Sequence, residues 1–172
     1  LWRELEDACC AASIITTRIP HFSWHIAEAY DMPRLQIILQ EITSDVSPFE
    51  VKTTGLGEFR GLSRVLYLSL AKDDQIDRLH KTLWERLKAV AQMPSPHYQP
   101  EMWVPHITLA HGDLSSEWLE CAQDFLIGQP LIWDIIVDNL SVGSQLDNQP
   151  GCILHEYPFR RKNRCRTLSS SD

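Results

Sequence analysis

Apolar and polar positions along the chain fall into blocks of different period, and each block predicts one element. Spacings of three and four, typical of helices that bury one face, cover residues 1–17, 33–44, 73–91 and 115–126. Runs typical of strands cover residues 21–27, 49–59, 63–71, 106–110, 131–144 and 152–159. Three prolines lie between Pro94 and Pro100, a density that predicts a loop without a regular element.

The order of these elements repeats. His21 begins a series of strand, helix, strand and strand, and His106 begins the same series. Each unit has an apolar helix face that it cannot bury alone, so we expect the two units to pack about a pseudo-twofold axis. The predicted fold class is α+β, with two pseudo-symmetric lobes, each an antiparallel sheet with helices outside, around a central groove. We expect residues 1–159 to form one bilobal domain, with lobes that meet at the repeats, and residues 160–172 to be a basic, disordered tail.

Both repeats open on the same short motif, a histidine followed two positions later by a hydroxyl residue. The first motif contains His21 and Ser23, and the second contains His106 and Thr108. Residues i and i+2 of a strand point to the same face, about 6.5–7 Å apart. Each motif is therefore expected to present an imidazole and a hydroxyl together, while the intervening apolar residues anchor the strand.

A third match to this pattern is the segment H-K-T-L, which begins at His80 and lies inside the strongest predicted helix. Residues i and i+2 of a helix point about 200° apart, so they cannot serve one substrate group. We interpret this match as a coincidence on a solvent-facing surface.

A pair of such motifs on strands suits the cleavage of a phosphodiester bond. One group must take a proton from the attacking hydroxyl or water, and another must protonate the leaving oxygen. Histidine can do both near neutral pH. A pseudo-twofold axis would place His21 and His106 on opposite sides of the phosphorus, and the hydroxyls of Ser23 and Thr108 would stabilise the charge on the non-bridging oxygens. This chemistry predicts four catalytic residues and needs no metal or cofactor.

The motifs, their separation of 85 positions and their place in a repeat resemble the 2H phosphoesterase superfamily. The most similar branch is the 2′-5′ RNA ligase and cyclic phosphodiesterase group. The segments that carry the likeness are V-P-H-I-T-L-A around His106, the hairpin from Gly55 to Leu68 and the closing strand from Leu154 to Phe159. The resemblance covers about residues 18–159. It implies a two-lobed α+β fold with both motifs lining a central groove, and activity on 2′,3′-cyclic phosphates or 2′-5′ linkages, or RNA ligation.

Five further residues are candidates for substrate binding. On a regular strand, His25 would share the face of His21, whereas His111 would point away from His106 unless Gly112 bends the strand. Arg60 could supply positive charge near a phosphate or remain on a solvated surface. The loop aromatics Tyr98 and Trp103 could stack on a base or pin the loop to the core.

The five cysteines form no C-x-x-C pair. We therefore expect reduced, mostly buried thiols and a cytoplasmic protein, rather than a disulfide framework or a zinc ribbon. The histidines at positions 97, 106, 111 and 155 lack the accompanying carboxylate and cysteine spacings of zinc sites, so no metal site is predicted.

The net charge is −7, and residues 1–159 carry 11 basic and 22 acidic side chains. Such an acidic body disfavours a long nucleic-acid footprint. No apolar run reaches the roughly 18 residues that a membrane span requires. The expected partner is a small nucleotide or an RNA end. We expect the protein to be a monomer that does not associate with a membrane.

The predicted function is a metal-independent phosphodiesterase of RNA processing. It would act on 2′,3′-cyclic phosphate or 2′-5′-type bonds of RNA ends or small nucleotides. Two alternatives stay open at this point. One is a 2′-5′ RNA ligase, because the same groups catalyse both directions. The other is a non-catalytic module that binds nucleotides or RNA ends.

Overall fold

The computed structural model of the chain describes residues 1–9, 19–61, 64–112, 114–144 and 151–160. Helices are interspersed with single strands and with runs of two or three strands along these residues. The helices are α1 (Trp2–Cys9), α2 (Met32–Asp45), α3 (Asp74–Leu87) and α4 (Ser116–Ile127), with a 3₁₀ turn η1 (Pro96–Tyr98). The strands are β1 (Ala27–Tyr30), β2 (Phe49–Phe59), β3 (Arg64–Leu70), β4 (Ala91–Pro94), β5 (His106–Gly112), β6 (Asp134–Val137), β7 (Asn139–Ser144) and β8 (Cys152–Pro158).

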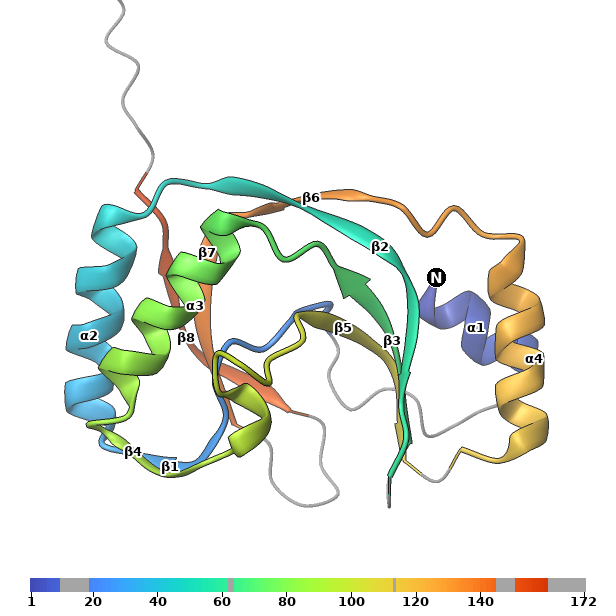
Figure 1. Cartoon of the computed structure of the whole chain (residues 1–172), viewed down its shortest axis with the longest axis horizontal. Helices are drawn as coiled ribbons and strands as arrows, with labels where there is room; N and C mark the ends of the chain where they lie inside the picture. Colours follow the sequence, from blue (N-terminus) through green and yellow to red (C-terminus); the bar gives the residue numbers. More distant parts are fainter. Residues whose placement is uncertain (10–18, 62–63, 113, 145–150, 161–172) are drawn as a thin grey trace, which may run out of the picture.

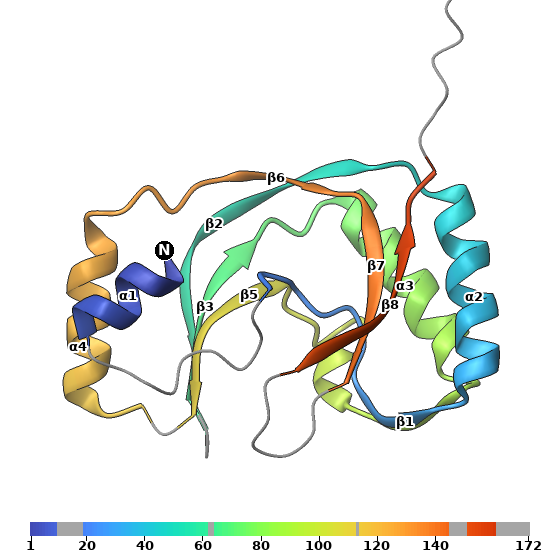
Figure 2. The ribbon, with the colours of Figure 1, turned by 180° about the vertical axis from the view of Figure 1, so that it is seen from behind.

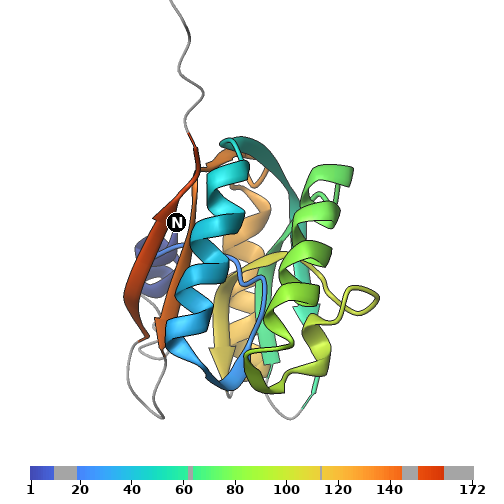
Figure 3. The same cartoon turned by 90° about the vertical axis from the view of Figure 1, so that its left-hand side faces the viewer.

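The strands form three antiparallel sheets. The largest has the order β5-β3-β2-β6, and the other two pair β7 with β8 and β1 with β4. Helices α1 and α4 lie outside one end of the large sheet, and α2 and α3 lie at the opposite end of the molecule (Figures 1 and 2). Figure 3 shows α2 and α3 side by side, where Arg86 of α3 forms an ion pair with Glu41 of α2. The predicted α+β class with antiparallel sheets is confirmed.

Each end of the molecule combines elements from both sequence repeats. Strand β3, from the first repeat, pairs with β5, from the second. Helix α2, from the first repeat, contacts β7 and β8, from the second. The apolar face of α2, which the first repeat cannot bury alone, is thus covered in part by strands of the second.

The helix starts follow the residues that the sequence offers as caps. The carboxylate of Asp73 accepts hydrogen bonds from the backbone N–H groups of Gln75 and Ile76 at 2.9 and 2.8 Å. The Ser115 hydroxyl accepts one from the N–H of Trp118 at 3.1 Å. Each side chain satisfies donors that the first helical turn leaves unpaired.

The predicted strand over residues 131–144 is wrong as a single element. It consists of β6, which pairs with β2, and β7, which pairs with β8. The chain changes sheet at Asp138, where two exposed residues follow one another between the buried Val137 and Leu140. The break in the alternation of burial marks the point where the chain passes from one end of the molecule to the other.

The predictions for the first motif and for the third helix also need correction. Residues 21–26 belong to no sheet strand: Phe22 forms an isolated bridge, the chain bends at Trp24, and the strand itself is β1. The helix predicted to reach residue 91 ends at Leu87, because residues 91–94 form β4 against β1. The proline-rich segment was predicted to have no regular element, yet it contains the last residue of β4 and the turn η1.

The prediction of reduced thiols is wrong for two of the five cysteines. Cys9 at the end of α1 and Cys121 in α4 form a disulfide that spans 112 positions. Cys152 is free and exposed. Two cysteines this far apart give no recognisable spacing, so only the packing of α1 on α4 reveals the pair. The cytoplasmic location rested partly on reduced thiols and stays a prediction without that support.

Two predicted segments fall outside the described residues, namely the second half of the helix over residues 1–17 and the tail beyond Arg160. None of the helices in the described part of the chain has the length and apolar character needed to cross a lipid bilayer.

Thr53→Val should lower the free energy of unfolding by about 2 kcal/mol or more. The buried Thr53 hydroxyl donates to the carbonyl of Leu131 at 2.6 Å and accepts from the N–H of Trp133 at 2.7 Å. Valine keeps the shape but leaves both backbone groups unpaired, and each such buried group costs about 1–3 kcal/mol. Urea unfolding measures the change. Thr54→Val, at the exposed neighbour, is the control, and equal losses in the two variants would contradict the argument.

Candidate active site

The two motifs meet at one pair of residues. Phe22 and Ile107 form an isolated antiparallel bridge. In this register His21 lies opposite Thr108, and Ser23 lies opposite His106. Side chains alternate along extended chains, so these four residues share one face while Phe22 and Ile107 point to the other, towards the core. We call the surface formed by the four residues the motif face.

The two histidines are held in the same way. Nδ1 of His21 lies 2.8 Å from the carbonyl oxygen of Ile19, and Nδ1 of His106 lies 2.8 Å from that of Val104. A carbonyl oxygen only accepts, so Nδ1–H is the donor in both rings. In the neutral imidazole this places the lone pair on Nε2. Both rings therefore present Nε2 as the nitrogen that exchanges a proton.

His106 lies in an aromatic pocket on the large sheet. Its ring centre is 5.0 Å from that of Phe59, edge to face, and 5.1 Å from that of Tyr67. Burial lowers the pKa of His106, the carbonyl of Val104 opposes the shift, and the nearby His21 adds to it. The two imidazoles are thus close enough for a charge on one to disfavour a charge on the other. This repulsion disfavours the state in which both rings are charged.

Sequence reasoning missed Phe59 and Tyr67. Tyr67 lies across β2 at Gly57, where a Cβ atom would come within 2.4 Å of the tyrosine ring. The residue at position 57 must therefore be glycine for Tyr67 to reach His106. The available clue was the alternation of the hairpin strands, which puts positions 57, 59, 65 and 67 on one face of the sheet.

His111 shares the side of the sheet on which His106 and Thr108 lie. The register of β5 against β3 shifts, because Ala110 pairs with Leu66 and Thr108 pairs with Tyr67. Leu109 is the extra residue of this β-bulge, so it and Ala110 both point into the core, where each is 0% exposed. The bulge, and not a bend at Gly112, brings His111 round to this side.

Of the two possibilities for Trp103, stacking on a base or pinning the loop, its burial favours the second, because the side chain is only 3% exposed. Its ring stacks on that of His80 at 3.8 Å and on that of Trp24 at 5.3 Å. The indole Nε1–H donates to the backbone carbonyl of Ser23 at 3.0 Å. Trp103 therefore pins the loop to the core.

His80, from the third match, is 0% exposed, so its interpretation as a solvent-facing residue is wrong. Helix α3 turns this histidine inwards, against Trp103. Burial lowers the pKa of His80 to about 4, and Lys72 adds to the effect, while the carbonyls of Trp24 and Tyr98 oppose it. Neither ring nitrogen has a hydrogen bond of standard geometry to a described residue. His80 is a neutral core residue behind the first motif.

The structure places His25 beside Tyr30 and Trp84. The chain bends at Trp24, so the regular strand on which its prediction relied ends there. Nδ1 of His25 lies 2.6 Å from the Tyr30 hydroxyl, and its ring packs against Trp84 of α3. Burial lowers the pKa of His25 to about 4.

The remaining predicted substrate residues have different surroundings. Tyr98 is half-buried and hydrogen-bonds the Ser23 side chain; burial raises the pKa of Tyr98 and this bond opposes the rise. Arg60 is exposed at the end of β2 and forms an ion pair with Glu58 at 2.9 Å. Tyr98 thus lies beside Ser23 of the first motif. The positive charge of Arg60, by contrast, is partly neutralised by Glu58.

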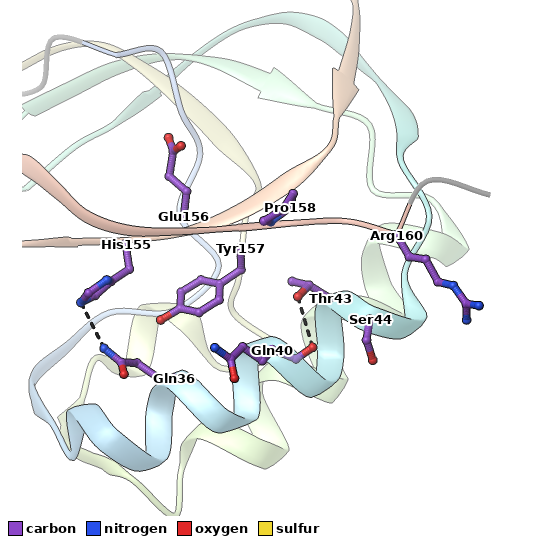
Figure 4. Close-up of a pocket in the computed structure, with 9 residues that line it drawn as sticks. All are labelled: Gln36, Gln40, Thr43, Ser44, His155, Glu156, Tyr157, Pro158 and Arg160. Carbon is purple, nitrogen blue, oxygen red and sulfur yellow. Dashed lines mark hydrogen bonds between the residues drawn. The ribbon is translucent and has the colours of Figure 1, made fainter. Parts of the chain in front are cut away.

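A cavity lies elsewhere, between α2 and β8 (Figure 4). Its lining includes Gln36, Gln40, His155 and Arg160, but none of the nine predicted site residues. Within the described part of the chain, no three His, Cys, Asp or Glu side chains gather closely enough to hold a metal ion. The predicted central groove is untested by these observations.

A family model described as the 2′-5′ RNA ligase superfamily matches residues 3–146, a span that contains both motifs. The chain belongs to this superfamily. The resemblance read from the motifs is thereby confirmed. Membership supports an enzyme of phosphoester chemistry without specifying its substrate.

A relative in Geobacillus kaustophilus (strain HTA426), named "Putative phosphoesterase GK0864", is 26% identical over 110 residues. The aligned region is 64% of this chain and 59% of that protein. The chain thus spans about three-fifths of the relative's length.

The free energy of unfolding should fall as the pH is lowered from 6.5 towards 4. The pKa values of His25 and His80 are about 4 in the folded protein, against 6.5 for an ordinary histidine. Between these pH values the two histidines bind more protons in the unfolded chain than in the folded protein. The stability that they contribute is therefore complete above pH 6.5 and is lost as the pH falls towards 4. Urea unfolding from pH 7.5 to 4.5 measures this slope.

His80→Phe keeps an aromatic ring against Trp103 but cannot titrate, so its slope should be shallower than the parent's. His97→Phe, at an exposed position, is the control and should keep the parental slope. A His80→Phe slope equal to that of the parent would contradict the assignment.

Proposed function

We propose that this chain is a metal-independent phosphodiesterase that cleaves 2′,3′-cyclic phosphates or 2′-5′-type bonds in RNA ends or small nucleotides. The observation that carries the proposal is the antiparallel bridge, which juxtaposes two His-x-Ser/Thr motifs with both rings held through Nδ1. The substrate is a small nucleotide or RNA end, and we propose that the protein acts as a cytoplasmic monomer.

The reaction is an in-line displacement at phosphorus. The neutral imidazole takes a proton at Nε2 from the attacking water, and the protonated one gives its Nε2 proton to the leaving ribose oxygen. The hydroxyls of Ser23 and Thr108 donate to the non-bridging oxygens, where negative charge accumulates. After each turnover the two rings have exchanged protonation states. His21 and His106 can take either role, since the reverse reaction uses the same groups in the opposite sense.

Ligation is the second candidate, favoured by the superfamily to which the chain belongs. It is the same in-line displacement at a cyclic phosphate, in which the 5′-hydroxyl of a second RNA end replaces water as the nucleophile and the same ribose oxygen leaves. A hydrolase accumulates the opened monophosphate from a cyclic phosphate. A ligase accumulates a joined product from cyclic-phosphate and 5′-hydroxyl ends, so one substrate mixture separates the two.

His21→Ala and His106→Ala should each lower kcat/KM at least a hundredfold, because each imidazole contributes about 10²–10⁴ to the rate. The assay follows the hydrolysis of nucleoside 2′,3′-cyclic phosphates and 2′-5′-linked dinucleotides with EDTA present. His97→Ala, at an exposed loop histidine, is the matched control and should retain parental activity.

Activity that survives both substitutions would overturn the catalytic assignment, and activity abolished by EDTA would overturn metal independence. An inactive parent that still binds nucleotide, with binding kept in both alanine variants, would favour a non-catalytic binding module.

A further inference from the structure

The hydroxyl residues of the two motifs share a feature of their backbone. Nε1–H of Trp103 donates to the carbonyl of Ser23 at 3.0 Å, and Nε1–H of Trp2 donates to the carbonyl of Thr108 at 3.2 Å. Ser23 and Thr108 occupy the same position in their motifs. The donors come from unrelated places, the loop before β5 and helix α1. The pseudo-twofold relation therefore extends beyond the side chains to one indole hydrogen bond on each motif.

These bonds lie beside the weakest part of the strand pairing. The two motif segments pair through Phe22 and Ile107 only. The ladder between the two segments does not continue beyond that pair. A backbone carbonyl in the protein interior needs a donor, and the indoles supply one beside each catalytic histidine.

Each indole is itself firmly held. Trp103 is 3% exposed and packs against both His80 and Trp24. Trp2 belongs to α1, whose Leu5 is 0% exposed and whose last residue, Cys9, is joined by the disulfide to α4. Both donors thus have fixed positions relative to the sheet.

We propose that Trp2 and Trp103 are positioning residues that aim the hydroxyls of Thr108 and Ser23 at the phosphate. This inference rests on the proposed function. Each indole fixes the carbonyl of one hydroxyl residue and hence the backbone from which that side chain projects. A misplacement of about 1 Å at a reacting group can cost about 10²-fold in rate. The indoles need not touch the substrate to affect the reaction.

Trp2→Phe and Trp103→Phe keep an aromatic ring and remove the N–H. Each should lower kcat about tenfold with KM changed by less than about twofold, because the hydroxyls act mainly on the charge of the transition state. Trp118→Phe in α4 is the control. Its Nε1 is buried and has no hydrogen bond to a described residue. Thermal unfolding of all three variants monitors their stability.

Double-mutant cycles test which hydroxyl each indole serves. In a Ser23→Ala background, adding Trp103→Phe should lower kcat by less than about twofold, whereas adding Trp2→Phe should still lower kcat about tenfold. In a Thr108→Ala background the pattern should reverse. A merely structural role would not produce this exchange. Equal effects in matched and crossed pairs, or a loss of kcat in Trp118→Phe as large as in the others, would overturn the proposal.

Two further measurements keep the test decisive. If Trp103→Phe does not fold, 3-benzothienylalanine at this position removes the N–H with almost no change of shape. If the parent cleaves none of the linkages, the proposed function fails. The same double-mutant cycles are then carried out with the Kd for adenosine 3′-monophosphate, determined by calorimetry, in place of kcat. Matched coupling there would support positioning of a phosphate-binding site. Additive effects, or no binding, would overturn it.

Discussion

The bridge between Phe22 and Ile107 is the contact on which the candidate active site depends. It joins segments 85 positions apart in the sequence and sets their register. A shift of one residue in either segment would turn a histidine and a hydroxyl into the core and bring apolar side chains out. Because both bridge residues pack into the core, burial of apolar surface maintains the register that a single pair of residues could not maintain alone.

One side of the candidate site is exposed to solvent, and the other side is packed against aromatic rings. His21 is exposed on the motif face, whereas His106 lies against Phe59 and Tyr67. Behind the first motif, Trp24, His80 and Trp103 form a stack of rings. The two imidazoles are therefore related by symmetry in their hydrogen bonds but not in their burial. The burial of His106 lowers its pKa, because a charged imidazole loses hydration there.

Periodicity and caps predicted most of the helices and strands, and the motif pair predicted the superfamily. What the sequence could not show depends on contacts between distant segments. The face of His111 depends on one extra residue, Leu109, in the pairing of β5 with β3. The burial of Trp103 and His80 depends on how a loop packs against α3, and the partner of Cys9 depends on how α1 packs against α4. None of these has a local pattern.

The exchange of elements between the repeats has a consequence for synthesis on the ribosome. Strand β3 leaves the ribosome long before its neighbour β5, and the same holds for β2 and its partner β6. At about 5–20 residues per second, the 36 positions from the end of β3 at Leu70 to the start of β5 at His106 take on the order of 2–7 s to translate. During this interval the edges of β2 and β3 are without those partners, and exposed edges of this kind promote aggregation. The two motifs can therefore meet only after the second one has been translated, and chaperones that cover strand edges would act on the first half of the chain.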